Sequence, residues 1–183
     1  MSLSRIIKRI VYRLRADYCT EDLIDMGLKI GKNFCRMHGT ILDPSHCWLI
    51  KIGDNVTLAP RVHVLAHDAS TCNHLGYARI GNVVIGDNVF VGADSVILPN
   101  VTIGDNSIIG ANSTVSRNIP ANVVVAGSPA RVICTLEEYL VKNRKLMKSN
   151  PVYGEDFTLR GNITTEKKRQ QYNDLIGKFG FVK

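Results

Sequence analysis

The chain has 183 residues, of which 45% are hydrophobic and 21% are charged, and its formal net charge is +7. This length predicts one domain with appendages and a hydrophobic core of its own. No apolar stretch approaches the ~18 residues that a membrane span needs, and the N-terminus is too charged for a signal peptide.

The cysteines and the basic tail narrow the class of protein further. Residues 131–183 carry eleven basic and six acidic side chains without the interleaved aromatic residues of a nucleic-acid platform. We therefore interpret the tail as a solvated helical face, with steering of a polyanionic cofactor and binding of nucleic acid or lipid as the alternatives. The odd cysteine count and the lack of a Cys-x-x-Cys pair argue against disulfides and structural zinc, and favour a reducing cytoplasm. The cysteines are Cys19, Cys35, Cys47, Cys72 and Cys134.

Helices are expected before the repeats, as an N-terminal cap over residues 1–28. Residues Leu3 to Leu14 place their apolar side chains on one stripe, with basic side chains elsewhere. Such a helix can lie on a membrane or cover the open end of a solenoid, and we favour the cap. A second short helix near Glu21 to Met26 would complete it.

Within residues 29–132, aliphatic residues recur at every sixth position. The text Ile-Gly-Asp-Asn begins at Ile52, Ile85 and Ile103. A period of six fits neither an α-helix nor one long strand, but it fits a chain that turns a corner after each short strand, with three hexads per coil. We expect the aliphatic residue to point inward, Val or Ser four residues later to lie beside it, and Gly, Asp and Asn to form corners that tolerate positive φ. The repeated residues are Ile52, Leu58, Val64, Ile85, Val91, Ile97, Ile103, Ile109 and Val115.

The period is interrupted twice. The segment from Gly39 to Ile50 departs from it, and residues 67–82 lack the inward aliphatic residues. We expect residues 67–82 to form a loop pushed out from a corner, and such interruptions of a solenoid usually serve function. After the repeats, helices are expected over Thr135 to Lys148 and Thr165 to Ile176, within a basic extension of residues 133–183.

From Ile30 to Val132 these hexads and corners resemble the hexapeptide-repeat acyltransferases. The nearest branch comprises the galactoside and maltose O-acetyltransferases and the O-acetyltransferases of surface-polysaccharide assembly. The resemblance implies an all-β solenoid, a left-handed parallel β-helix with an N-terminal capping helix and a C-terminal helical extension. It further implies a homotrimer that binds acetyl-CoA between neighbouring subunits and acetylates a sugar hydroxyl of a surface glycan precursor.

His67 is the candidate general base, at the start of the extruded loop. The resemblance implies that it takes the proton of the acceptor hydroxyl while the oxygen attacks the thioester carbonyl. A free imidazole, with a pKa of ~6.5, is mostly unprotonated at neutral pH, and a positioned base contributes roughly 10²–10⁴-fold. The thioester is already activated, so no metal is required. The alternative is a histidine with a structural role only.

On the acceptor side, Asp43 and His46 lie about one coil before His67, and Asp68 follows it directly. We expect each to contact the acceptor; for Asp43 and His46 the alternative is hydrogen bonding within a bulged loop. His63 and His67 are four residues apart, which would make a metal pair on a helix, but this segment is predicted as strand and corner.

On the cofactor side, the resemblance implies that the backbone N–H of Ala93 binds the oxyanion. Phe90 and Gly92 of the same segment would also bind the cofactor, Phe90 as an aromatic wall for the pantetheine arm or a sugar face, and Ala111 would contact the pantetheine arm. Ser116 and Arg117 would lie near the outer part of CoA, and Arg131 near its adenine and 3′-phosphate, where a guanidinium suits a phosphate. For Ala111 and Ser116 the alternative is that they only occupy positions of the repeat and have no contact with the cofactor.

The acceptor is the least determined part. After Asn33-Phe34 the chain lacks a match to the sugar-binding asparagine of the resembled family, which argues against a simple galactoside or maltose acceptor. An amine, serine or xenobiotic acceptor is the alternative substrate, and a non-catalytic trimeric scaffold is the alternative class of protein. Nucleic acid is not expected as a partner, and membrane contact is not favoured.

Overall fold

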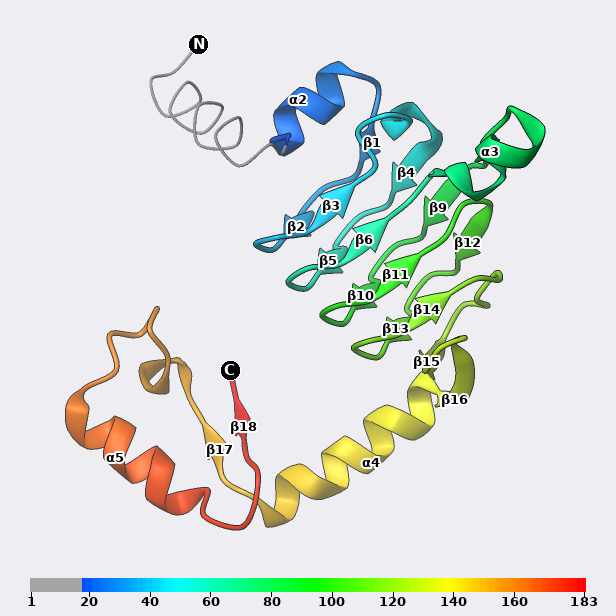
Figure 1. Cartoon of the computed structure of the whole chain (residues 1–183). Coiled ribbons are helices and arrows are strands. Elements are labelled where there is room, and N and C mark those ends of the chain that lie inside the picture. Colours follow the sequence, from blue (N-terminus) through cyan, green and yellow to red (C-terminus); the bar gives the residue numbers. More distant parts are fainter. Residues whose placement is uncertain (1–17) are drawn as a thin grey trace, which may run out of the picture. The chain divides into compact units, whose positions relative to one another are not determined.

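The computed structural model describes residues 18–183 (Figure 1), so the helix expected from Leu3 to Leu14 lies outside the described residues. The chain divides into two compact units, one ending at Leu136 and one spanning Glu137–Lys183. Among the described residues, no helix has the length and apolar character needed to cross a bilayer.

The first unit is a solenoid in which every coil contributes one short strand to each of three faces. The first face contains β1 (Lys29–Ile30), β4 (Ile50–Ile52), β9 (Val83–Ile85) and β12 (Val101–Ile103). The second contains β2 (Cys35–Arg36), β5 (Thr57–Leu58), β10 (Phe90–Val91), β13 (Ile108–Ile109), β15 (Val123–Ala126) and β16 (Arg131–Thr135). The third contains β3 (Ile41–Leu42), β6 (His63–Val64), β11 (Val96–Ile97) and β14 (Thr114–Val115). Within these three faces all pairs are parallel except β15 with β16, which confirms the predicted parallel β-helix.

The core consists of the residues that the six-residue period predicts. All nine repeated aliphatic side chains are at most 2% exposed, and the register stacks them coil on coil, for example Ile52 on Ile85 and Ile85 on Ile103. Val56, Val89 and Ser107, four residues after three of them, are buried as expected. Burying a large aliphatic side chain stabilises by roughly 1.5–3 kcal/mol, so this column supplies much of the driving force for the coil.

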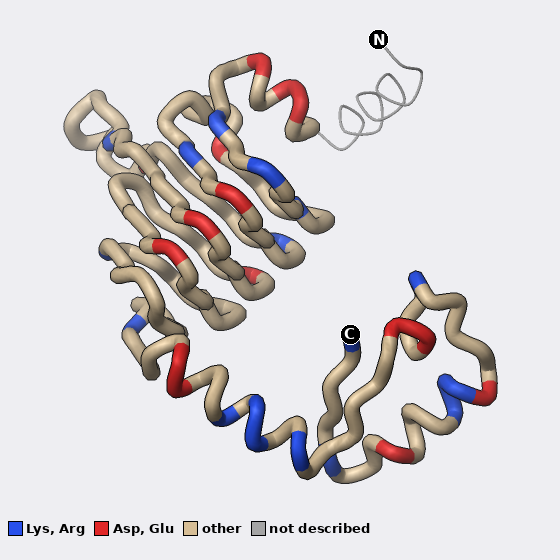
Figure 2. The backbone as a smooth tube through the Cα atoms, turned by 180° about the vertical axis from the view of Figure 1, so that it is seen from behind, with Lys and Arg blue, Asp and Glu red and all other residues tan. Residues whose placement is uncertain are grey.

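The corner between the first and second faces, the first corner, is formed by Gly-Asp-Asn. The asparagines there have φ near +55°, and their side-chain amides hydrogen-bond from coil to coil, Asn55 to Asn88 at 3.0 Å and Asn88 to Asn106 at 3.0 Å. Acidic residues stand at matching positions of successive coils (Figure 2), and the N–H of Asp54 donates to Asp87 at 2.7 Å. The positive φ expected at this corner is therefore taken by the asparagine and not by the glycine. Glycine is required because a Cβ at Gly86 would overlap Asp105 of the next coil.

The second corner joins the second and third faces, and the third corner leads from the third face to the next coil. The register places Pro60, Ala93 and Ala111 at one position of the second corner in successive coils, because Phe90 pairs with Thr57 and with Ile108. Asp43, Leu65, Leu98 and Ser116 share the first position of the third corner, each after a strand of the third face.

Both interruptions of the repeat fall at the third corner. The first is narrower than expected, since Ile41 and Leu42 keep their register and only residues 43–49 leave the coil, ending in the 3-10 helix η1 (Cys47–Leu49). In the second, β7 (His67–Asp68) pairs antiparallel with β8 (Arg79–Ile80), and η2 (Ala69–Thr71) and α3 (Cys72–Leu75) lie between them. This loop is drawn with α3 in Figure 1.

The N-terminal end of the solenoid is covered by α2 (Thr20–Asp25), whose Leu23 is fully buried in the solenoid's core cluster. The second unit begins at Glu137, not at the expected residue 133, because β16 pairs with β15 and so belongs to the solenoid. It contains most of α4 (Leu136–Ser149), then η3 (Glu155–Phe157), α5 (Thr165–Asp174) and an unexpected parallel pair, β17 (Val152–Tyr153) with β18 (Phe181–Val182).

Candidate active site

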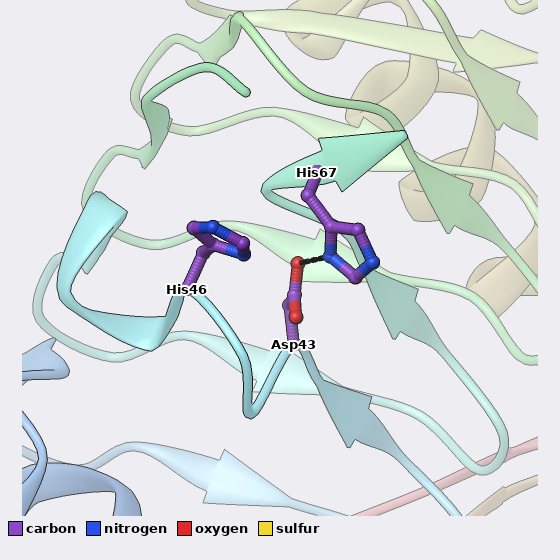
Figure 3. Close-up of side chains that lie close together, drawn as sticks. All are labelled: Asp43, His46 and His67. Atoms are coloured by element: carbon purple, nitrogen blue, oxygen red, sulfur yellow. Dashed lines mark hydrogen bonds and ion pairs between the residues drawn. The ribbon is translucent and has the colours of Figure 1, made fainter. Parts of the chain in front are cut away.

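His67 and Asp43 form a hydrogen-bonded pair at the third corner (Figure 3). The Nδ1 atom of His67 lies 2.5 Å from Oδ2 of Asp43, although the two residues are 24 positions apart. The His67 side chain is 33% exposed and the Asp43 side chain 1% exposed. The imidazole therefore has one edge fixed by a buried carboxylate and another edge that reaches solvent.

Asp43 is held in place by further donors. Its Oδ2 accepts the N–H of Ala66 and its Oδ1 accepts the N–H of Ser45, both at 3.0 Å. Burial alone would raise the pKa of Asp43, but the hydrogen bonds from His67, Ala66 and Ser45 outweigh it and lower the pKa below its ordinary value. Asp43 is thus an ionised hydrogen-bond acceptor behind the imidazole. Its contact with the acceptor substrate stays a prediction, and the structure instead shows a buried carboxylate whose oxygens already accept these hydrogen bonds.

His46 lies beside this pair on the bulge of residues 43–49. Its ring centroid is 5.1 Å from that of His67, and its buried Nδ1 has no hydrogen-bond partner among the described residues. Donor atoms of Asp43, His46 and His67 lie within 4.8 Å of one another, a set that could hold a transition-metal ion. The structure thus brings His46 to the site, as the sequence predicts, while its contact with an acceptor stays a prediction.

Asp68 belongs to the extruded loop and is paired there. Its carboxylate binds the guanidinium of Arg79 across the β7–β8 pair and accepts the N–H of Ser70 at 2.9 Å. The hydrogen bond from Arg79 holds the pKa of Asp68 well below its usual range. Neighbouring side chains on a strand point to opposite faces, so Asp68 points away from the imidazole. It lines a cavity of about 720 Å³ together with Arg79, Ile80, Leu98, Pro99, Asn100 and Ser116.

Ala93 lies at the second corner, and its backbone N–H has no acceptor among the described residues. The corner does not depend on this N–H, because Pro60 occupies the same position one coil earlier. Gly92 is required for close packing, since a Cβ there would overlap the backbone of Ala111. The geometry thus leaves one backbone donor free, as an oxyanion site needs.

The remaining cofactor candidates divide between the same two corners. Phe90 and Ala111 are exposed beside Ala93, and Arg131 is exposed at the start of β16 on the second face. Ser116 and Arg117 are exposed at the third corner, where the register stacks them under Leu98 and Pro99 of the preceding coil. The structure therefore brings His67, Ser116 and Arg117 to one edge of the prism, and Phe90, Gly92, Ala93, Ala111 and Arg131 to another.

Two residues of the site were not expected from the sequence. Arg79 pairs with Asp68 in the extruded loop, and the ring centroid of Trp48 is 5.2 Å from that of His46. The signal for Trp48 was its place in the first interruption, one coil before the candidate base.

Comparison with known proteins agrees with this geometry. Residues 82–117 match the family model described as bacterial transferase hexapeptide (six repeats). Protein CapG of Staphylococcus aureus is 38% identical over 74% of this chain and 83% of its own length. The galactoside O-acetyltransferase of Escherichia coli is 40% identical over 67% of this chain. A hexapeptide-repeat acetyltransferase of Vibrio cholerae, crystallised with acetyl coenzyme A, is 28% identical with a TM-score of 0.54, over 60% of this chain and 61% of that one. The chain spans 54–66% of the length of four curated relatives, 63% for the E. coli enzyme.

Proposed function

Because the chain belongs to the hexapeptide-repeat acetyltransferases, whose solenoid is a left-handed parallel β-helix, we propose that it transfers the acetyl group of acetyl-CoA to a sugar hydroxyl. The observation that carries this proposal is the hydrogen bond between Asp43 and His67 at the mouth of the extruded loop. A buried carboxylate that fixes one edge of a half-exposed imidazole is the arrangement that a general base needs.

The tautomer of His67 follows from its partner. The lowered pKa of Asp43 keeps the carboxylate ionised and able only to accept, so Nδ1 of His67 carries the proton and Nε2 has the free lone pair. Nε2 takes the proton of the acceptor hydroxyl while its oxygen attacks the thioester carbonyl carbon. The C–S bond then breaks, and the proton passes from His67 to the leaving thiolate of CoA. The products are the acetyl ester and CoA.

The site is completed by a second copy of the chain. His67 follows the third face and Ala93 follows the second face, so one prism carries the base and the oxyanion donor on different edges. A neighbouring subunit that places its second corner against this third corner would bring the two groups to one acetyl group. This division supports the homotrimer, with CoA held between Phe90, Ala111 and Arg131 of one subunit and Ser116 and Arg117 of the next.

We assign the acceptor to a saccharide, with a surface glycan precursor as its class. Support comes from the similarity to a galactoside O-acetyltransferase and from the polar groups that line the cavity at the third corner. The cytoplasm is the proposed location, because Cys19, Cys35, Cys47, Cys72 and Cys134 are all free thiols.

The test is thiol release from acetyl-CoA with a panel of saccharides, amines, serine and antibiotics. His67→Ala should lower kcat by about 10²-fold or more with the accepted sugar, because the base is lost. His63→Ala is the matched control, since His63 lies on β6 four residues earlier, and it should leave kcat nearly unchanged. Full turnover by His67→Ala would overturn the assignment of the base. Silence across the panel without acetyl-CoA binding would instead indicate a scaffold.

The same assay tests whether a metal takes part. In the proposed mechanism His67 acts as a base without a bound metal ion, so dialysis against a chelator should leave kcat unchanged. Activity that is lost on chelation and restored by zinc would show that the donors of Asp43, His46 and His67 hold an ion.

A further inference from the structure

Trp48 is the single tryptophan of the chain, and its side chain is 52% exposed beside the candidate base. Other large apolar residues are more exposed, such as Tyr77 and Tyr172, but they lie on the extruded loop and on α5. Exposed apolar residues are common when they are scattered. What distinguishes Trp48 is its position next to the site and the way in which its backbone is held.

The bulge that carries Trp48 is rigidly built. Cys47 is fully buried, the N–H of Leu49 donates to the carbonyl of His46 at 3.0 Å, and the carboxylate of Asp43 accepts the N–H of Ser45. A Cβ at Gly27 would lie 2.9 Å from Cβ of Trp48, so the tryptophan rests directly on a glycine backbone whose φ is +110°. The indole therefore projects from a fixed point, and a ligand that stacks on it needs little reordering of the loop.

A row of rings connects Trp48 to His67. The centroids of Trp48 and His46 are 5.2 Å apart with planes tilted by 47°, and those of His46 and His67 are 5.1 Å apart with planes tilted by 38°. His46 is thus packed between the exposed indole and the imidazole that takes the proton. A flat substrate face that lies on Trp48 is held two ring contacts from the base.

We propose that Trp48 is the stacking platform for a pyranose ring of the acceptor and determines the specificity for saccharides. The inference rests on the proposed function and names the residue that recognises its substrate. The C–H groups on one face of a pyranose are apolar, and a large aromatic face desolvates them, while the hydroxyls at the ring edge stay free to reach His67. A small amine or amino acid offers no such face, so Trp48 favours a sugar over those acceptors.

The single tryptophan makes this binding directly observable. Each saccharide of the turnover panel, with maltose and methyl β-galactoside among them, is titrated into the full-length protein in the presence of CoA, and the emission of Trp48 is followed. We expect a saturable change with the accepted sugar and none with serine. The same titration of His67→Ala should give the same response, because binding on the indole does not need the base.

Kinetics of variants supply the second arm. Trp48→Ala should raise KM for the sugar about tenfold or more and change kcat by less than about threefold, while Trp48→Phe should retain most of the affinity. KM for acetyl-CoA should not change in either variant. Tyr172→Ala is the matched control, because it removes an exposed aromatic ring on α5, and it should change neither constant.

The outcomes separate this inference from the reaction itself. An unchanged KM in Trp48→Ala, with sugar still acetylated, overturns the platform and leaves the proposed reaction in place. A sugar-dependent emission change without any turnover supports the platform and overturns the reaction. No emission change with any sugar, or loss of the oligomer in Trp48→Ala, overturns the platform, the latter because it would place Trp48 in a subunit interface.

Discussion

At the scale of single residues, the backbone donor of Ala93 is testable because the chain itself shows which substitution the corner accepts. Pro60 occupies the equivalent position one coil earlier, so Ala93→Pro should fold and lose only the N–H. We expect kcat to fall about 10²–10³-fold, the typical effect of removing one oxyanion donor, with little change in acetyl-CoA affinity.

Ala93→Ser is the matched control, because it keeps the N–H and should keep kcat within about threefold of the unsubstituted protein. Steady-state kinetics and the unfolding temperature of both variants check this. An Ala93→Pro protein that is folded and fully active would remove Ala93 from the oxyanion site.

Asp43 should contribute both to catalysis and to stability. Asp43→Asn should lower kcat at least about tenfold, since the amide no longer fixes the imidazole tautomer. It should also lower the free energy of unfolding near neutral pH by about 1–3 kcal/mol, because buried hydrogen bonds to the carboxylate are lost.

The pH dependence of that second effect has a definite sign. The fold lowers the pKa of Asp43, so its contribution is present above the unfolded-state pKa of ~3.9 and is lost as the pH falls through the folded-state pKa. The difference in unfolding free energy between the two proteins should therefore shrink below about pH 4, as measured by denaturant unfolding. A difference that stays constant from pH 7 to pH 3 would show that the ionised carboxylate is not what stabilises.

At the scale of elements, the hydrogen-bonded column of asparagines at the first corner should reverse the usual order of stability, in which an alanine variant is more stable than a glycine variant. Asn88 has φ of +55° and hydrogen-bonds to asparagines above and below it. Asn88→Ala and Asn88→Gly both lose these bonds, but only alanine is strained at this φ, by about 1–2 kcal/mol. We expect the alanine variant to unfold several degrees below the glycine variant.

The control uses a helical site. Asn143 lies in α4, where alanine is favoured over glycine, so there Asn143→Ala should be the more stable variant. Thermal unfolding of the four proteins gives the comparison. The same order at both positions would mean that the corner does not require a left-handed residue.

At the scale of the whole molecule, the proposed sharing of the site between subunits predicts complementation between two inactive variants. His67→Ala lacks the base and Ala93→Pro lacks the oxyanion donor, so each alone should be nearly inactive. In oligomers assembled at random from equal amounts, about one half times one half of the sites, or about a quarter, would receive both intact groups. Co-expression of differently tagged variants should recover about that fraction of activity, whereas a site within one subunit would recover none.

Much of the fold can be predicted from the sequence, because the repeat is long and each position of the repeat requires the same kind of side chain in every coil. Nine aliphatic positions and the asparagines of the first corner fix the faces, the register and the core. The site is harder to predict from the sequence, because it forms where the repeat is interrupted. The pairing of Asp43 with His67 depends on how residues 43–49 fold into a bulge, and the pairing of Asp68 with Arg79 depends on how the extruded loop closes on itself. The proposed roles of Ala93 and Arg131 rest on family resemblance, and a backbone donor such as that of Ala93 leaves no trace in residue type.

The reversal of the chain at β16 affects whether a second molecule can extend the solenoid at its C-terminal end. A stack of parallel coils offers its last strands as a template, and a second molecule could extend it into a fibre. On the second face the template is missing, because β16 runs antiparallel to β15 and continues into α4. A coil of a second molecule added to that face would lie next to β16, which runs in the opposite direction to the strands of the coils. The turn thus removes the edge of β15 as a template for a further parallel coil on the second face.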